Sequence, residues 1–264
     1  MFDSYFEPLP DLQAYLQRIG MENEPVELSK AYVDKLIVAH LDRIPFENLD
    51  VWDGHKTPSL RTPDLFDKLV LHKRGGYCFE QNGLLYAVLT ALGFECYTTG
   101  MRILRATSTD IPTIAHRSVI CIIDGKKHLC DVGYGGMAIC EAVPFDAPAT
   151  DNGYHFEFEG DYTFFCKDCE GEHKRVFMFI DTPLTTKDFE IYNYYISEPE
   201  KAGMKRMPMI TRVVNGGRIQ YVGGKLSTTD INSKNVQLIR EISDKKELQQ
   251  VLEEMFGIEY HFES

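Results

Sequence analysis

The sequence lacks the features that mark membrane, secreted and nucleic-acid-binding proteins. It has no run of about 18 apolar residues, the length that a membrane-spanning helix requires. Its first residues, Met1-Phe2-Asp3-Ser4-Tyr5, show neither the basic start nor the apolar core of a secretion signal. Basic residues are also scarce, since 28 Lys and Arg stand against 40 Asp and Glu and give a net charge of −12. Phosphate binding needs clustered positive charge, so we expect neither a membrane nor nucleic acid as a partner.

Cysteine is present, but not in the spacing of a disulfide framework. The seven cysteines are an odd number scattered along the chain, which indicates a reduced, cytoplasmic environment. Cys166 and Cys169 are closely spaced and have His155 and His173 nearby in the sequence. A structural zinc site usually combines two such cysteine pairs, and the sequence has no second pair. We therefore interpret residues 166–169 as a hairpin tip and expect no metal.

The residue patterns change twice along the chain. Residues 1–94 carry apolar positions at helical spacing, with helix start signals at Ser29 and at Thr62-Pro63. Residues 95–185 instead alternate short aromatic or β-branched segments with turn signals such as Asp124-Gly125, which is typical of an antiparallel barrel or sandwich. The 264 residues, 44% of them hydrophobic, are enough for a sizeable core.

The last part of the chain, residues 186–264, mixes helices and strands. A helical pattern spans 186–196, a hairpin signal lies at Asn215-Gly216-Gly217, and Asp244 with Glu247 begins a closing helix. The regular alternation of strand and helix that a doubly wound parallel sheet requires is absent from the sequence. We therefore predict an α+β fold with three domains, namely a helical domain, a β domain and a small mixed domain at 1–94, 95–185 and 186–264.

A candidate nucleophile follows the tight turn that Gly75-Gly76 predicts. Cys78 comes almost at once, and an apolar run over 84–92 then predicts a helix that ends at Gly93. Cys78 therefore lies at or near a helix N-terminus, where unpaired N–H groups and the helix dipole favour a thiolate, and Arg74 adds positive charge nearby. The alternative is a buried structural cysteine, which is the commoner role of an isolated cysteine.

The Asp124-Gly125 turn would place a histidine and an aspartate on one face of a hairpin. With a two-residue loop at this turn, Asp131 lies opposite Ser118, and His116 points to the same face from two residues earlier. The two are then diagonal neighbours about 7–8 Å apart by backbone geometry, whereas a three-residue loop would place them on opposite faces. An aspartate orients a histidine and makes it more basic, so His116 is a candidate base for the cysteine. Each residue alone also has an ordinary structural interpretation.

A glycine-rich loop, Val132-Gly133-Tyr134-Gly135-Gly136, follows Asp131 directly. Three glycines in so short a stretch allow the backbone to approach a ligand closely, including a phosphate. The spacing matches neither the P-loop nor the dinucleotide fingerprint, so a flexible loop is an equally good interpretation. The sequence also contains no HExxH and no GxSxG motif.

Five stretches, in this order over nearly the whole chain, together resemble the arylamine N-acetyltransferase family. They are Ile-Pro-Phe-Glu-Asn-Leu at 44–49, Arg-Gly-Gly-Tyr-Cys at 74–78, His116, Asp-Val-Gly-Tyr-Gly-Gly at 131–136 and the closing helix at 252–258. The resemblance implies an N-terminal helical bundle, a central antiparallel β-barrel and a C-terminal α/β lid around a cysteine-protease-like Cys-His-Asp core.

The resemblance also implies the reaction, a ping-pong transfer of acetyl from acetyl-CoA to an arylamine or arylhydrazine. Cys78 would hold the acetyl group as a thioester, His116 would relay protons and Asp131 would hold His116. Two other functions remain as alternatives. An amide synthase or acyl-thioester hydrolase would use the same triad on another acyl donor. A non-enzymatic binding protein could retain the fold, but it would have no physical need for all three residues.

Further roles follow from the same resemblance. Arg74 and Glu47 would form a buried ion pair that supports the nucleophile, and Phe46 and Tyr134 would line the acceptor pocket. Tyr77 and Tyr134 stand where many members have Phe or Trp, so their hydroxyl groups bear on acceptor preference. Coenzyme A would lie between the barrel and the lid, near the glycines of the loop after Asp131 (Gly133, Gly135 and Gly136).

Overall fold

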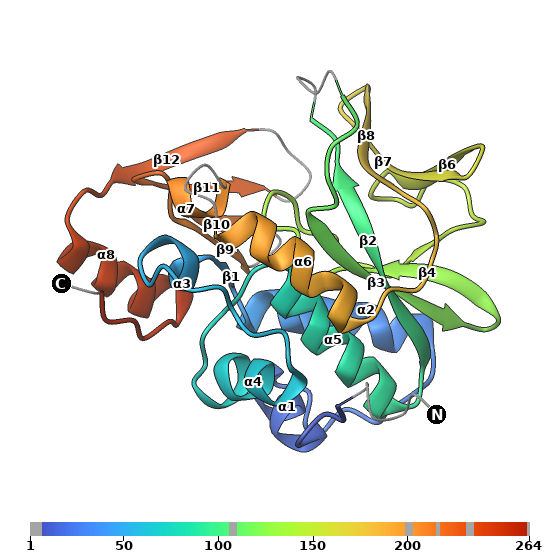
Figure 1. Ribbon diagram of the computed structural model, residues 1–264, viewed down its shortest axis with the longest axis horizontal. Coiled ribbons are helices and arrows are strands. Elements are labelled where there is room, and N and C mark those ends of the chain that lie inside the picture. Colours follow the sequence, from blue (N-terminus) through green and yellow to red (C-terminus); the bar gives the residue numbers. More distant parts are fainter. Residues whose placement is uncertain (1–6, 106–109, 199–202, 215–216, 231–234, 263–264) are drawn as a thin grey trace.

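The computed structural model describes residues 7–105, 110–198, 203–214, 217–230 and 235–262. Two antiparallel sheets and a group of helices make up the molecule (Figure 1). Among these residues, no helix has both the length and the apolar character that crossing a membrane would need.

Most N-terminal helices form where the sequence predicts them, because their ends carry the expected caps. Asp11 and Ser29 accept hydrogen bonds from first-turn N–H groups of α1 and α2. Gly20 and Gly93 follow α1 and α5 in the left-handed conformation that glycine favours. The elements of this part are α1 (Leu12–Ile19), α2 (Lys30–Arg43), α3 (Leu49–Trp52), α4 (Thr62–Phe66), the π-helical turn η2 (Asp67–Leu71) and α5 (Cys78–Leu92).

One predicted helix cap is wrong. Thr62 is the first residue of α4 rather than the residue before it, and Arg61 at the cap position makes no capping bond. The carboxylate of Glu7 instead accepts the backbone N–H of Thr62 at 3.2 Å and replaces the missing cap. Glu7 lies 55 positions away in the chain, so a local sequence motif could not reveal it.

Seven strands form a nearly closed antiparallel barrel in the order β5-β4-β3-β2-β8-β7-β6 (Figure 1). The predicted register of the β3–β4 hairpin is confirmed, since Ile123 pairs with Lys126. Asp124 and Gly125 have φ angles of 51° and 73°, the left-handed values that a two-residue hairpin turn requires. The strands are β2 (Glu95–Ile103), β3 (His116–Ile123), β4 (Lys126–Cys130), β5 (Val143–Pro144), β6 (Tyr154–Glu159), β7 (Tyr162–Cys169) and β8 (Glu172–Phe179).

The predicted hairpin tip at 166–169 is wrong. Strand β7 continues through Cys169, which pairs with Glu172, and the chain turns at Glu170 and Gly171. These two residues have φ angles of 52° and 79°. Cys166 and Cys169 therefore lie within one strand at an odd separation, which directs their side chains to opposite faces of the sheet.

The second sheet has the order β1-β9-β10-β11-β12 and joins distant parts of the chain. Strand β1 (Phe46–Glu47) comes from the N-terminal part and pairs with β9 through Phe46 and Thr211. The predicted β9–β10 hairpin is confirmed by the pairing of Val214 with Gly217, while 215–216 lie outside the described residues. The other strands are β9 (Met209–Val214), β10 (Gly217–Val222), β11 (Lys225–Asp230) and β12 (Val236–Glu241).

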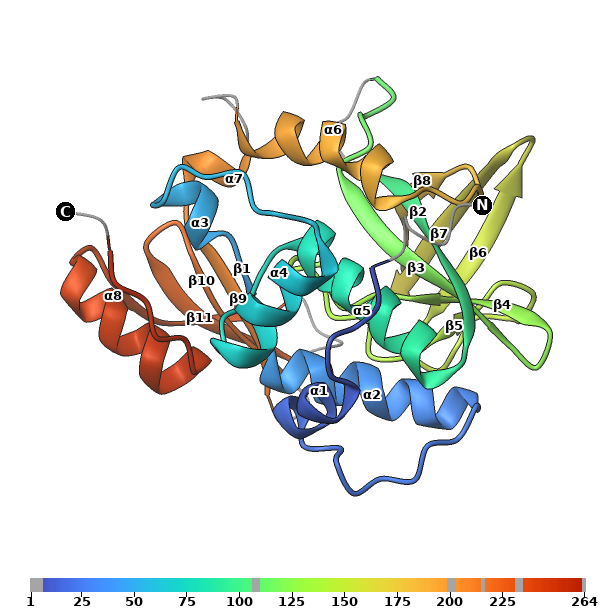
Figure 2. The same cartoon turned by 60° about the horizontal axis from the view of Figure 1, so that its bottom comes forward.

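Helix α5 crosses the centre of the molecule, with α1 and α2 on one side and α6 (Thr186–Ser197) on the other (Figure 2). The short α7 (Gly203–Arg206) follows α6, and α8 (Lys245–Val251) with the π-helical turn η3 (Leu252–Phe256) packs on the second sheet. Buried residues around Cys78 at the start of α5 come from β1 and α6. The nucleophile candidate therefore lies where the barrel, the second sheet and α6 meet.

Candidate active site

Cys78 is the first residue of α5, and only 3% of its surface is exposed. The carboxylate of Glu80 accepts the N–H of Tyr77 at 3.0 Å and so fixes the residue before the helix. The S–H group of Cys78 donates to the carbonyl of Ala115, with 3.6 Å between sulfur and oxygen. The thiol therefore lies at a capped helix N-terminus, beside the residue that precedes β3.

His116 and Asp131 meet across the β3–β4 hairpin. Nε2 of His116 lies 2.6 Å from Oδ2 of Asp131, and both residues are fully buried. The hydroxyl of Ser118 donates to the same carboxylate oxygen, and the N–H of Gly133 donates to Oδ1 at 2.9 Å. Because Asp131 occupies Nε2, Nδ1 is the imidazole nitrogen left to interact with Cys78.

Asp131 makes His116 a strong base. Burial lowers the pKa of His116, but the charge and hydrogen bond of Asp131, with a further hydrogen bond to Cys78, outweigh burial and raise this pKa to about 10. Burial raises the pKa of Asp131, but the charge of His116 and the hydrogen bonds of its neighbours hold it below its usual value. At neutral pH the pair is an imidazolium and a carboxylate. The positive charge beside the sulfur atom stabilises negative charge there.

Two aromatic rings hold the imidazole in place. Phe177 of β8 stacks on His116, with ring centroids 4.8 Å apart and 13° between the planes. Tyr134 meets the imidazole edge-on at 5.6 Å. Together with the Asp131 contact, these rings restrict rotation of His116, which suits a base that has to face one sulfur atom.

Asn82 and Gly133 join the hairpin to α5. The amide of Asn82 donates to the carbonyl of Arg117 at 2.5 Å and accepts the N–H of Val132 at 2.9 Å. Asn82 follows Cys78 by four residues, so both side chains lie on one face of the helix. A Cβ atom on Gly133 would lie 2.7 Å from Cα of Cys78, so only glycine fits there. No sequence motif marks Asn82, although its four-residue spacing from Cys78 within one helix is a usable signal.

A partly buried network of charges lies behind the nucleophile. Nε and Nη2 of Arg74 contact Oε1 of Glu47 at 3.0 and 2.7 Å, and Nη2 also bonds Asp50 at 2.8 Å. Lys68 lies 2.7 Å from carboxylate oxygens of both Asp50 and Glu80. The ion pair between Arg74 and Glu47 is therefore part of a five-residue network that ends on the capping Glu80 of α5. Sequence reasoning missed Asp50 and Lys68, because no motif marks them.

Two cavities of different size lie along the glycine-rich loop. Phe46, Tyr134 and Gly135 line a cavity of about 20 Å³, which is too small for an aromatic ring. Tyr134 and Gly136 also line a cavity of about 320 Å³ between the barrel and strands β10 and β11. Within the described part of the chain, Gly133 and Gly135 do not line the larger cavity. Gly135 instead packs on Phe46, where a Cβ atom would lie 2.7 Å from the ring.

Basic side chains from three strands line the larger cavity. Lys167 and Lys174 come from β7 and β8, and Arg218 comes from β10. Arg218 also donates to the carbonyl of Gly136 and thereby contacts the glycine-rich loop. Sequence reasoning missed this group, since its members lie far apart in the chain and in no common motif.

The two tyrosines of the family motifs have different surroundings. Tyr134 lines both cavities, whereas Tyr77 is fully buried and its hydroxyl donates to Oδ1 of Asn193 in α6. The amide of Asn193 donates in turn to the carbonyl of Pro58 at 2.8 Å. The hydroxyl of Tyr77 therefore joins α6 to the N-terminal part of the chain.

The chain is similar to known proteins over most of its length. The N-acetyltransferase family model matches residues 31–263. A curated arylamine N-acetyltransferase of Mycolicibacterium smegmatis is 33% identical over 195 residues, which cover 71% of this chain and 70% of that protein. The structure of an M. smegmatis arylamine N-acetyl transferase matches with a TM-score of 0.86 at 28% identity, covering 94% of this chain and 92% of that one. The Mycobacterium marinum arylamine N-acetyltransferase in complex with CoA matches with a TM-score of 0.85 at 24% identity, covering 94% and 93%.

Proposed function

Because this chain belongs to the arylamine N-acetyltransferase family, we propose that Cys78, His116 and Asp131 are the catalytic triad of its acetyl transfer. The protein is an acyltransferase, and acetyl-CoA is its co-substrate. The observation that carries the triad is the 2.6 Å contact between His116 and Asp131, which leaves Nδ1 of the imidazole for the sulfur of Cys78.

The first half of the reaction forms an acetyl-enzyme. Cys78 reacts as a thiolate while the imidazolium of His116 holds a proton on Nδ1, and this thiolate attacks the carbonyl carbon of acetyl-CoA. The bond between that carbon and the sulfur of CoA then breaks. The CoA sulfur takes a proton from the imidazolium and leaves as free thiol. One thioester replaces another, so this half-reaction is close to thermoneutral.

The second half discharges the acetyl group to an arylamine or arylhydrazine. The amine nitrogen attacks the carbonyl carbon of acetyl-Cys78, and His116 accepts the proton that this nitrogen loses. The carbon–sulfur bond breaks, and Cys78 returns to its starting state. Asp131 stabilises the imidazolium in both halves and keeps its Nδ1 directed at the sulfur atom.

We propose that CoA binds in the cavity between the barrel and strands β10 and β11. Its lysine and arginine side chains suit the phosphate groups of CoA. Tyr134 lines this cavity and also contacts the imidazole of His116, so the cavity extends to within one side chain of the triad. Gly136 also lines this cavity and is the proposed glycine contact of CoA. Gly133 and Gly135 would instead shape the loop, because they pack against Cys78 and Phe46.

Phe46 and Tyr134 are the proposed contacts of the aromatic acceptor. Both rings border the small cavity beside the glycine-rich loop. At about 20 Å³ this cavity is too small for an arylamine, so the acceptor needs a rearrangement of these rings or the space that CoA leaves. Arg74 and Glu47 would support the nucleophile from behind.

The proposed domains are the helical part at 1–94, the barrel at 95–185 and the α/β lid at 186–264, around a cysteine-protease-like core. The first domain is not fully separate from the third, since Phe46 and Glu47 of β1 pair with β9 in the sheet of the lid. The lid and the helical part are therefore joined by backbone hydrogen bonds as well as by the Tyr77–Asn193 contact.

Initial rates test this function against its alternatives. The free CoA thiol is measured while acetyl-CoA and an aromatic hydrazine are varied together. A ping-pong acetyltransferase gives parallel double-reciprocal lines and releases CoA in steady state only when the hydrazine is present. CoA release at a comparable rate without hydrazine would identify a hydrolase. The absence of turnover with every acyl-CoA tested would favour a binding protein.

A further inference from the structure

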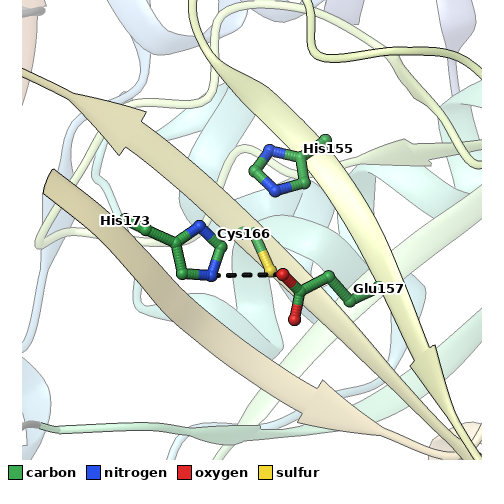
Figure 3. A group of neighbouring side chains, drawn as sticks. All are labelled: His155, Glu157, Cys166 and His173. Atoms are coloured by element: carbon green, nitrogen blue, oxygen red, sulfur yellow. Dashed lines mark ion pairs between the residues drawn. The ribbon is translucent and has the colours of Figure 1, made fainter. Parts of the chain in front are cut away.

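Four potential metal ligands converge on one face of the barrel sheet, on three neighbouring strands (Figure 3). His155 and Glu157 lie on β6, Cys166 on β7 and His173 on β8. One donor atom from each lies within 4.8 Å of all the others. These residues take no part in the acetyl transfer proposed above.

Strand pairing explains why these side chains meet. His155 pairs directly with Cys166, and Glu157 follows His155 by two residues on the same face. Asp168 pairs with His173 and follows Cys166 by two residues, so both also lie on that face. The cluster therefore follows from the two hairpins β6–β7 and β7–β8, and not from a chance approach of flexible side chains.

Asp168 orients both imidazoles toward the centre of the cluster. Its Oδ1 lies 2.9 Å from Nδ1 of His173, and its Oδ2 lies 3.6 Å from Nδ1 of His155. The carbonyl of Gly153 also lies 3.4 Å from Nδ1 of His155. Both rings therefore direct Nε2 toward the other donors, and Nε2 of His173 already lies beside the carboxylate of Glu157. A carboxylate that holds the other nitrogen of a metal-binding histidine is a recurrent arrangement.

The other two donors are held in place as well. Oε1 of Glu157 lies 3.2 Å from Nε2 of His173, while Oε2 of Glu157 is held by Arg175 at 2.6 Å. Glu157 can thus offer one oxygen atom while its other oxygen stays paired. Cys166 is fully buried beneath the two histidines, and the side chain of His173 is 48% exposed. An ion can therefore reach the cluster from solvent.

We propose that His155, Glu157, Cys166 and His173 form a structural zinc site. Two imidazole nitrogens, one sulfur and one carboxylate oxygen are a donor set that zinc accepts in tetrahedral geometry, and the sulfur disfavours calcium and magnesium. The four donor atoms lie within 4.8 Å of one another. Because zinc–ligand bonds are about 2.0–2.3 Å long, these atoms would move slightly closer together when the ion binds. Binding forms one Zn–S, one Zn–O and two Zn–N bonds, and the thiol proton of Cys166 passes to solvent.

The bound ion would fasten the free edge of the barrel. In the described sheet, β6 is the last strand and is paired on one side only, with β7. Ligands from β6, β7 and β8 would join all three strands at one point. We therefore expect zinc to stabilise the folded protein without taking part in acetyl transfer.

Metal titration of the full chain tests this site. A Cys78→Ala background removes the thiol of the active site, where a sulfur and the imidazole of His116 also meet. The metal-free protein is titrated with ZnCl2 against a chromophoric chelator, and with CoCl2 while the visible spectrum is recorded. We expect one equivalent of each metal, a tetrahedral cobalt spectrum with a thiolate charge-transfer band, and a higher melting temperature with zinc.

Variants locate the ion. His173→Gln removes a ligand through a half-exposed side chain and should lower zinc affinity by at least about 10–100-fold. Asp168→Asn removes the carboxylate that orients both histidines and should lower zinc affinity by about 10–100-fold. The cobalt form of Asp168→Asn should still show the thiolate charge-transfer band. The matched controls are His72→Gln, an exposed histidine that also pairs with an aspartate, and Cys96→Ser, a partly exposed cysteine elsewhere. Neither control should change the affinity. Weak binding of several ions, or tight binding that His173→Gln leaves unchanged, would overturn the proposal.

Discussion

Oδ2 of Asp131 lies 2.6 Å from Nε2 of His116, and the two residues come from the two sides of one hairpin. This contact decides which nitrogen of the imidazole faces Cys78. It exists because Asp124 and Gly125 form a two-residue turn, which sets the register of the hairpin. A one-residue slip would turn one of the two side chains to the other face of the sheet.

Asp131→Asn should lower kcat by roughly 10²–10⁴-fold, the usual contribution of a positioned base. The amide has almost the shape of the carboxylate but lacks the charge that raises the pKa of His116. Asp146→Asn is the matched control, since Asp146 is an exposed carboxylate paired with Lys126 of the same hairpin. The control should keep wild-type kcat. Equal kcat values for Asp131→Asn and the wild type would show that Asp131 has no role in orienting the base.

The stability that His116 contributes should depend on pH with a defined sign. Its pKa is 6.5 in its ordinary state and about 10 in the fold, so the contribution is complete below 6.5 and is lost as pH rises through about 10. Urea unfolding of the wild type and of His116→Gln across this window should give free energies that converge as pH rises.

His40 supplies the control for that experiment. Burial lowers its pKa to about 4, so His40 stays neutral throughout the same window. The difference between the wild type and His40→Gln should therefore not vary above pH 6.5. A difference for His116→Gln that is equally constant would contradict the assignment of a charged His116–Asp131 pair.

Gly133→Ala should disturb the junction between the hairpin and α5. The new Cβ atom would lie 2.7 Å from Cα of Cys78 and 2.8 Å from the amide nitrogen of Asn82, and neither can move freely. Overpacking of this kind costs about 1–3 kcal/mol, which thermal unfolding detects. Gly136→Ala is the comparison, because its Cβ atom would meet the ring of Tyr134 at an ordinary 3.4 Å. A larger loss of stability for Gly136→Ala than for Gly133→Ala would refute this explanation.

The sequence was informative where local chemistry decides the structure. The Asp124-Gly125 turn fixed the hairpin register and hence the meeting of His116 with Asp131. The glycine pair and the apolar run placed Cys78 at the start of a helix. The same reasoning about turns, applied to Glu170 and Gly171, would have placed His173 on the face that carries Cys166. Interpreting 166–169 as the turn concealed that arrangement.

Other features depend on partners that are distant in the chain, so no local pattern could predict them. Strand β1 has only two residues and forms because β9 offers a free edge to Phe46 and Glu47. The hydroxyl of Tyr77 donates to Asn193, which lies 116 positions away in the sequence. Tertiary packing determines such contacts, and the local secondary-structure propensity of the residues does not.

The intact mass of the protein after incubation with acetyl-CoA tests most directly whether Cys78 carries the acetyl group. We expect a single acetyl adduct that peptide mapping locates on Cys78, that Cys96→Ser retains and that Cys78→Ala lacks. An aromatic hydrazine should discharge the adduct and yield the acetylated hydrazide. An adduct that persists in Cys78→Ala, or no adduct on the wild-type protein, would contradict the proposed mechanism.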